Sequence, residues 1–124
     1  MRVFVTKAFN RFARSERIWA DRLLEAVGRA GRGLVDADLG GGLIKQRVAR
    51  PGQGRSGGYR TVIAFRWLDR AVFLHGFAKS ERDNIKDADL ARLKRLAGIF
   101  LDASPKDLER WCERGELEEV RWNG

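Results

Sequence analysis

The basic side chains between Lys45 and Lys79 are the residues of this chain best suited to binding phosphate. No Asp or Glu lies between Leu39 and Leu68. The same interval contains the basic residues Lys45, Arg47, Arg50, Arg55, Arg60 and Arg66. A concentration of cations without neutralising acids attracts polyanions.

A glycine-rich segment lies in the middle of these cations. The nine residues from Arg50 to Gly58 include four Gly and one Pro. This composition predicts a loop without regular structure, whose backbone N–H groups are free to meet an anion. The glycines alone favour an ordinary long hairpin connection, but Arg50 and Arg55 at the shoulders of the loop favour phosphate contact.

Composition narrows the class of partner. The chain has 124 residues, a net charge of +8 and a pI of about 10.5. The length fits one domain, and the charge favours nucleic acid as partner ahead of an anionic membrane surface. Cys112 and His75 are the single Cys and the single His, so we expect neither a disulfide, a metal nor a cofactor. No apolar run reaches transmembrane or signal-peptide length, so we expect a cytoplasmic protein without membrane contact.

Strand patterns position the basic residues. We expect a first strand over Arg2–Thr6 and a second over Leu43–Ala49, in which alternation places Lys45 and Arg47 on the same face. Tyr59–Trp67 is the strongest strand pattern, followed by a tight connection and a partner over Ala71–Phe77. We expect Tyr59, Ile63, Phe65 and Trp67 to face the core.

Helical patterns flank these strands. The residues from Lys7 to Gly33 predict a pair of helices rather than one kinked helix, with Ser15 suited to cap the second. The apolar spacing over Asp87–Leu101 predicts a further helix, and Ser104 with Pro105 predicts the start of another. The residues from Glu116 to Trp122 should be extended. We expect Trp19 and Trp111 in the core or at an interface.

Three segments, taken in order, carry a family resemblance: Lys45-Gln-Arg47, Arg55-Ser-Gly-Gly-Tyr-Arg60 and Gly76-Phe-Ala-Lys-Ser-Glu-Arg82. Together they resemble the RelE/HigB-like toxins of bacterial type II toxin–antitoxin systems. The resemblance implies an α+β fold of the microbial ribonuclease type, with an N-terminal strand and helical hairpin packed on a mainly antiparallel sheet. It also implies a ribosome-dependent mRNA endonuclease, and a small antitoxin, often of the helix-turn-helix type, that neutralises it.

The resemblance assigns roles to individual residues. It implies catalytic positions at Lys45, Arg47, Arg60 and Lys79, and RNA contacts at Arg50, Arg55, Arg66, Arg82 and Lys86. Two departures stand out, because several relatives carry a functional tyrosine where this chain has Lys86, and others use several His and acids where this chain offers only His75.

These residues suit a cleavage in which the RNA 2′-OH attacks its own phosphodiester without a metal. With no carboxylate on the basic strands, Lys45 is the candidate base, because Arg47 and Arg60 nearby disfavour its protonated form. Arginine suits the role of binding the phosphorane, because its fork binds two phosphate oxygens. The alternative is a non-catalytic binding protein of the same fold, either a gyrase-inhibiting toxin or a nucleic-acid-binding module.

The C-terminal residues differ in charge from the middle of the chain. From residue 102 to 124 there are seven acids and four bases. We expect residues 1–101 to form the toxin domain and 102–124 to form a helix and extended tail of the same domain. The tail either provides a surface for the antitoxin or completes the core.

Overall fold

The computed structural model describes residues 1–50, 54–78 and 85–122, and it gives only the backbone of residues 54–57. The described elements are β1 (Arg2–Thr6), α1 (Lys7–Ser15), α2 (Ala20–Gly31), β2 (Ala37–Gly40), β3 (Leu43–Arg50), β4 (Gly54–Arg66), β5 (Arg70–Ala78), α3 (Asp87–Asp102), α4 (Pro105–Glu113) and β6 (Leu117–Glu119). None of the helices within these ranges is both long and apolar enough to span a membrane.

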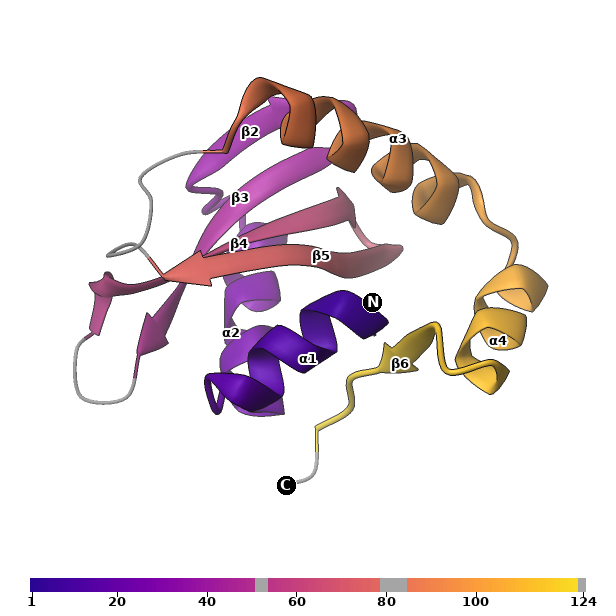
Figure 1. Cartoon of the computed structure of the whole chain (residues 1–124), viewed down its shortest axis with the longest axis horizontal. Helices are drawn as coiled ribbons and strands as arrows, with labels where there is room; N and C mark the ends of the chain where they lie inside the picture. The colour runs from indigo at the N-terminus through magenta and orange to yellow at the C-terminus, as the bar shows by residue number, and fades with distance from the viewer. Residues whose placement is uncertain (51–53, 79–84, 123–124) are drawn as a thin grey trace.

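Within the described residues, the strands form one six-stranded sheet in the order β2-β3-β4-β5-β1-β6. β1 pairs in parallel with β5, and every other neighbouring pair is antiparallel. Figure 1 shows α1 and α2 on one side of this sheet and α3 on the other. We call these two sides the α1–α2 face and the α3 face. The expected α+β fold, with a helical pair on a mainly antiparallel sheet and helices at the C-terminus, is therefore confirmed.

The central strands carry core residues on both faces. On the α1–α2 face, Ile44, Val48, Tyr59 and Ile63 pack with Phe9 and Leu23 of the two helices. On the α3 face, Leu43, Val62, Ala64 and Val72 pack with Leu93, Ala97 and Leu101. Burial of a large apolar side chain stabilises the fold by about 1.5–3 kcal/mol. Two separate apolar clusters therefore hold helices to opposite sides of the same strands.

Two buried polar side chains connect these layers. Gln46 donates to the carbonyl oxygens of Ala26 (2.9 Å) and Leu34 (3.2 Å), and its own oxygen accepts from the Asp36 amide (2.7 Å). Arg70, at the start of β5, donates to the carbonyl oxygens of Phe100 (2.9 Å) and Ala103 (2.7 Å). These bonds fix β3 to α2 and to the segment after it, and β5 to the end of α3. The Arg70 bonds satisfy carbonyl groups that a helix end leaves without partners.

Two helices begin at a capping side chain, and the second helix does not begin where the sequence predicted its cap. Thr6 caps α1 by accepting from the Phe9 amide, and Ser104 caps α4 in a reciprocal pair with Asp107. The expectation that Ser15 caps the second helix is wrong, because Ser15 is the last residue of α1 and the N-cap of α2 is Trp19. Arg17, with a φ of 57°, turns the chain between the two helices.

Two further expectations are corrected. The predicted loop from Arg50 to Gly58 is too long, because β4 begins at Gly54 and Arg50 pairs with Gly54 across the hairpin. Trp67 does not face the core. Its side chain follows the last residue of β4 and is 63% exposed, and its indole nitrogen donates to the Gly31 carbonyl oxygen at the end of α2 (3.0 Å). Trp19 is also exposed, whereas Trp111 packs edge-on against Phe100.

Candidate functional site

Two rows of residues cross β3, β4 and β5 on the α3 face. In the first row Lys45 pairs with Val62 and Val62 pairs with His75. In the second row Arg47 pairs with Arg60 and Arg60 pairs with Phe77. Directly paired residues share a face, and residues two positions apart on a strand return to it. The two rows, which we call the basic rows, therefore bring Lys45, Arg47, Arg60 and His75 to one surface.

Arg60 is at the centre of this surface. It is the direct neighbour of Arg47 and the diagonal neighbour of both Lys45 and His75. Diagonal positions on adjacent strands lie about 7–8 Å apart, within reach of long side chains. Lys45 and His75 are separated by one strand, which corresponds to about 10 Å between backbones. A single phosphate near Arg60 would thus have a basic side chain on each side.

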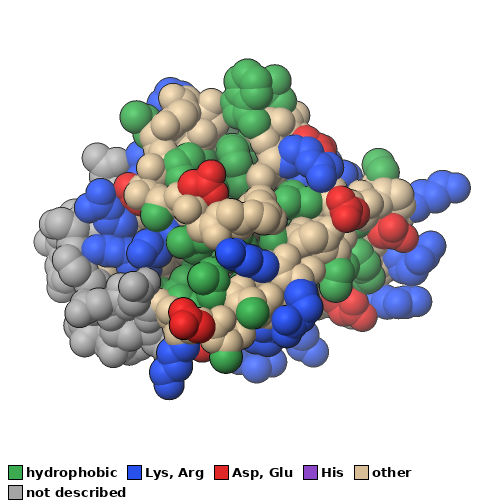
Figure 2. Space-filling view, turned by 90° about the horizontal axis from the view of Figure 1, so that it is seen from above, with side chains coloured by type: hydrophobic (Ala, Val, Ile, Leu, Met, Phe, Trp, Pro, Cys, Tyr) green, Lys and Arg blue, Asp and Glu red, His purple; other side chains and the backbone are tan. Residues whose placement is uncertain are grey.

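α3 packs mainly toward the end of the strands opposite the basic rows. Its buried residues form one cluster with Leu43, Ala64 and Val72 at that end, and with Val62 of the first row, which is fully buried. Lys45, Arg60 and His75 are half-buried, and the Arg47 side chain is 45% exposed. Figure 2 looks onto this side of the molecule and shows Lys and Arg side chains gathered at the left, with a second group, mixed with acids, at the right.

Two glycines in the segments that carry the resemblance have a packing role. A Cβ on Gly58 would overlap the Val48 carbonyl oxygen, at the place where the β3–β4 register shifts. A Cβ on Gly76 would lie 2.5 Å from Phe12 and 3.1 Å from Phe9, both in α1. Gly58 therefore allows the two strands to approach closely, and Gly76 allows α1 to pack on β5.

A carboxylate that the sequence analysis missed lies beside the basic rows. Asp36, directly before β2, accepts a hydrogen bond from the Arg47 amide (2.6 Å) and one from its guanidinium Nη2 (3.2 Å). Burial raises the pKa of Asp36, but the hydrogen bonds from Arg47 and the charges of Arg47 and Arg29 outweigh this effect, so the pKa lies below its ordinary value. The sequence signal for this position of Asp36 was the glycine turn after Leu39, which allows β2 to fold back on β3.

The other predicted RNA-contact residues are dispersed. The Arg50 guanidinium lies 5.5 Å from the ring centroid of Tyr59, which belongs to the core of the α1–α2 face, so Arg50 does not join the basic rows. Arg66 is six residues beyond Arg60 on β4, or about 20 Å away. It forms ion pairs with Asp69 (3.3 Å) and Asp102 (3.7 Å). Arg66 therefore lies outside the site.

Lys86 is the N-cap residue of α3 and is exposed. Its neighbour Ile85 packs against the core of the α3 face, so Lys86 lies on the same side of the sheet as the basic rows. Lys79 and Arg82 lie outside the described residues, as does the side chain of Arg55, whose backbone belongs to β4. Among the described residues, no group of three or more His, Cys, Asp or Glu could hold a metal ion.

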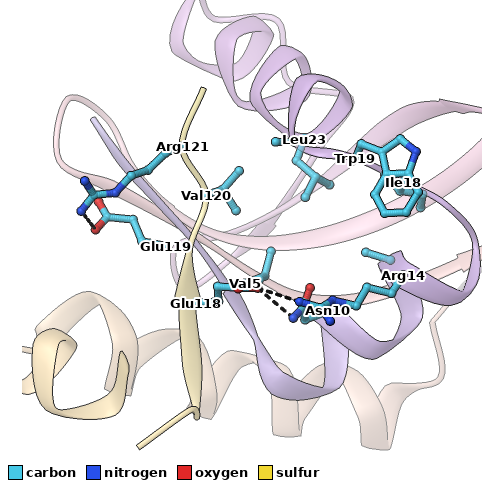
Figure 3. Close-up of a pocket in the computed structure, with 12 residues that line it drawn as sticks. Val5, Asn10, Arg14, Ile18, Trp19, Leu23, Glu118, Glu119, Val120 and Arg121 are labelled. Atoms are coloured by element: carbon cyan, nitrogen blue, oxygen red, sulfur yellow. Dashed lines mark hydrogen bonds and ion pairs between the residues drawn. The ribbon is translucent and has the colours of Figure 1, made fainter. Parts of the chain in front are cut away.

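A second surface feature involves the C-terminal segment. A groove of about 820 Å³ separates α1 and the start of α2 from residues 118–121. Figure 3 shows Trp19 and Leu23 on one side, Val120 and Arg121 on the other, and Val5 between them. The acids at its rim have partners within the chain, because Glu118 accepts from Asn10 (2.9 Å) and lies 3.8 Å from Arg14, and Glu119 accepts from Arg2 (3.0 Å) and Arg121 (3.0 Å).

Comparison with known proteins identifies the family to which the chain belongs. Neither the curated proteins nor the solved structures gave a match to this chain. Residues 1–120 match the family described as the RelE toxin of the RelE/RelB toxin–antitoxin system. Toxins of this kind are typically ribosome-dependent endoribonucleases, and each is paired with a RelB-type antitoxin. The match covers nearly the whole chain, and the chain therefore belongs to the RelE toxin family.

Proposed function

We propose that this toxin is a ribosome-dependent mRNA endoribonuclease that cleaves by attack of a 2′-OH on the adjacent phosphodiester. The observation that carries the proposal is the position of Arg60, beside Arg47 and diagonal to both Lys45 and His75 on the α3 face of the sheet. Because translated mRNA is the substrate, the proposed reaction takes place in the cytoplasm.

Each basic residue has a distinct part in this reaction. Arg60 and Arg47 bind the non-bridging oxygens and stabilise the charge that develops on the phosphorane. Lys45 removes the proton from the 2′-OH, and His75 on the far side of Arg60 protonates the leaving 5′ oxygen. The separation of Lys45 and His75 by one strand suits an attack in which the nucleophile and the leaving oxygen are on opposite sides of phosphorus. Lys79, Arg55, Arg82 and Lys86 add affinity for the RNA backbone.

The composition of the site supports the proposed dependence on the ribosome. Basic side chains attract RNA regardless of its sequence, but they hold the reacting 2′-OH in line only weakly. A ribosome presents the message in a fixed path and so provides the orientation that the basic rows lack. We therefore expect little cleavage of free RNA.

The test is induction of the toxin in cells, followed by primer extension on a translated message and on the same message with its start codon removed. We expect new 5′ ends only on the translated message. Intact message together with a DNA-damage response would instead support the gyrase-inhibiting alternative. Intact message with normal growth would overturn both.

The C-terminal segment is the proposed antitoxin surface. Val120 and Arg121 line the groove next to the exposed Trp19, so this surface offers a partner an apolar contact. Removal of the segment is not a usable test, because Leu108 and Leu117 are buried in the core of the α3 face. We expect Trp19→Ala and Trp122→Ala to reduce co-purification with the product of the adjacent gene, whereas Trp67→Ala, equally exposed but distant from the groove, should not. Equal capture by all three variants would exclude this surface.

A further inference from the structure

Arg47 is held at its backbone and at its side chain by the same carboxylate. One oxygen of Asp36 accepts from the Arg47 amide at 2.6 Å, and the other accepts from Nη2 of the guanidinium at 3.2 Å. The guanidinium has five N–H donors, so the contact with Asp36 leaves an edge of the fork for a phosphate.

Asp36 is in turn fixed from the other side of the sheet. Arg29 of α2, whose side chain is 5% exposed, lies 3.6 Å from Asp36 through Nη1 and 2.7 Å from Glu25 through Nε. Its Nη2 donates to the Arg47 carbonyl oxygen. Asp36 therefore joins two arginines, one in the buried polar network under α2 and one in the basic rows. A carboxylate held in this way has little freedom to move, because its withdrawal would leave the buried Arg29 without one of its two acids.

We propose that Asp36 is the positioning residue for Arg47, and that it fixes the guanidinium at the β2 side of the basic rows in the orientation that binds the reacting phosphate. This inference rests on the proposed function of the same site. Asp36 does not touch the RNA, and it acts only through Arg47. Its negative charge also weakens the attraction of the site for RNA, so its role in orientation and its effect on affinity have opposite signs.

These opposite signs predict an unusual kinetic result. Asp36→Asn leaves the shape of the side chain but removes its charge, so Arg47 gains rotational freedom while the site becomes one unit more positive. We expect the single-turnover cleavage rate on message-programmed ribosomes to fall roughly tenfold, within the range for coupling between residues in contact. The toxin concentration that gives half the maximal rate should stay the same or fall. Loss of a merely structural contact would instead lower the fraction of active protein and leave the rate of the folded fraction unchanged.

Asp38→Asn is the matched control. It makes the same charge change two residues away, and its side chain touches the Gly40 amide rather than Arg47. We expect its cleavage rate to equal that of the wild type. The second control is Arg47→Ala, in which Asp36→Asn should have no further effect on the rate. If Asp36→Asn does not fold at the assay temperature, Asp36→Glu, which keeps the charge for Arg29 but shifts the carboxylate, takes its place with the same expected loss.

The outcomes separate the two proposals. If the wild-type toxin does not cleave, the proposed function fails. If the wild type cleaves and Asp36→Asn is as fast as Asp38→Asn, or faster, the positioning role is wrong. A tenfold loss that persists in the Arg47→Ala background would also overturn it, because Asp36 would then act through some other group.

Discussion

Tyr59 and Arg60 are adjacent in sequence and belong to opposite faces of the same strand. Tyr59 lies in the row of Val48 and Ala78, is 2% exposed and packs edge-on against Phe12 at 5.7 Å. Burial raises the pKa of its hydroxyl, and Glu16 adds to the effect through a hydrogen bond and its charge. Arg60 lies in the next row and faces the side on which α3 packs. One face of these strands thus packs against two helices, and the other face carries both the core under α3 and the basic rows.

The comparison shows how a small sheet can carry both a core and the candidate site on the same strands. Successive side chains alternate between faces, so the pairing that buries Val48, Tyr59 and Ala78 also aligns Arg47 with Arg60. A slip of one residue would send the cations into the core and the core into water. The stability of the α1–α2 face therefore determines the geometry of the basic rows.

Alanine substitutions of Arg60 and of Tyr59 should have the largest effects, one on cleavage and the other on stability. Arg60→Ala should lower the cleavage rate by about a hundred- to a thousandfold, as for loss of one electrostatic contact to a transition state. Tyr59→Ala should lower the free energy of unfolding by about 3–5 kcal/mol, as for other large aromatic truncations in a core. Cleavage on programmed ribosomes and chemical denaturation measure the two effects. A large loss of stability in Arg60→Ala, or of cleavage in a fully folded Tyr59→Ala, would contradict the division between the faces.

Substitution of Lys45 tests the chemistry proposed for the basic rows. Lys45→Ala should reduce the rate about a hundredfold or more, because a general base contributes typically 10²–10⁴. Lys45→Arg should reduce it equally, since arginine keeps the charge but does not accept the proton. Single-turnover rates on programmed ribosomes distinguish a general base at this position from a positive charge alone. Activity retained by Lys45→Arg would show that this position supplies only charge.

A side chain at Gly58 should disturb both faces together. The new Cβ would meet the Val48 carbonyl oxygen at the register shift between β3 and β4. We expect Gly58→Ala to lower the free energy of unfolding by about 1–3 kcal/mol, in the range for forced backbone shifts, and to slow cleavage because Arg47 and Arg60 no longer align. Gly98→Ala is the control, since a Cβ there meets nothing within 4 Å. Both variants can be compared by thermal unfolding and by cleavage rate.

Low pH should produce the smallest effect, a loss of folding stability that arises from Asp36 beside the basic rows. The pKa of Asp36 is lower in the folded state, so its ionisation stabilises the fold at neutral pH. That contribution is present above the pKa of an unfolded Asp, about 4, and is lost as the pH falls through the lower folded value. We expect wild-type stability to fall more steeply than that of Asp36→Asn between pH 5 and pH 3, as followed by urea denaturation. Parallel curves for the two proteins would contradict this coupling.

The sequence predicted most elements, because their signals are local. The apolar spacing over Asp87–Leu101 gives α3, and Ser104 with Pro105 gives the start of α4. The alternation over Leu43–Ala49 and the tight turn after Trp67 place Lys45, Arg47 and Arg60 on one face, as expected. These predictions held because alternation along a strand and capping at a helix end depend on neighbouring residues.

The misses depend on contacts between distant residues. Asp36 reaches Arg47 only because Gly40, Gly41 and Gly42 all have positive φ and turn β2 back along β3. Arg66 is on its expected strand, whereas Arg50 extends β3 into the predicted loop. Tyr59 holds Arg50 on the other face, and two acids hold Arg66 at the far end. Alternation assigned Trp67 to the core, but it lies after the strand's last residue, where no helix covers it. Sequence spacing alone does not predict contacts between side chains that are far apart in the sequence.

The position of β1 has a consequence for synthesis of the toxin. β1 lies between β5 and β6, and its residues Val5 and Thr6 pair with Glu118 and Leu117. Among the described strands, β1 is therefore translated first and pairs with the one translated last. At 5–20 residues per second, the intervening stretch takes roughly 6–23 s to translate. During that time the nascent chain has its N-terminal strand but lacks the edge strand that completes the sheet. The cell thus acquires the finished toxin only after nearly every codon of the described chain has been read.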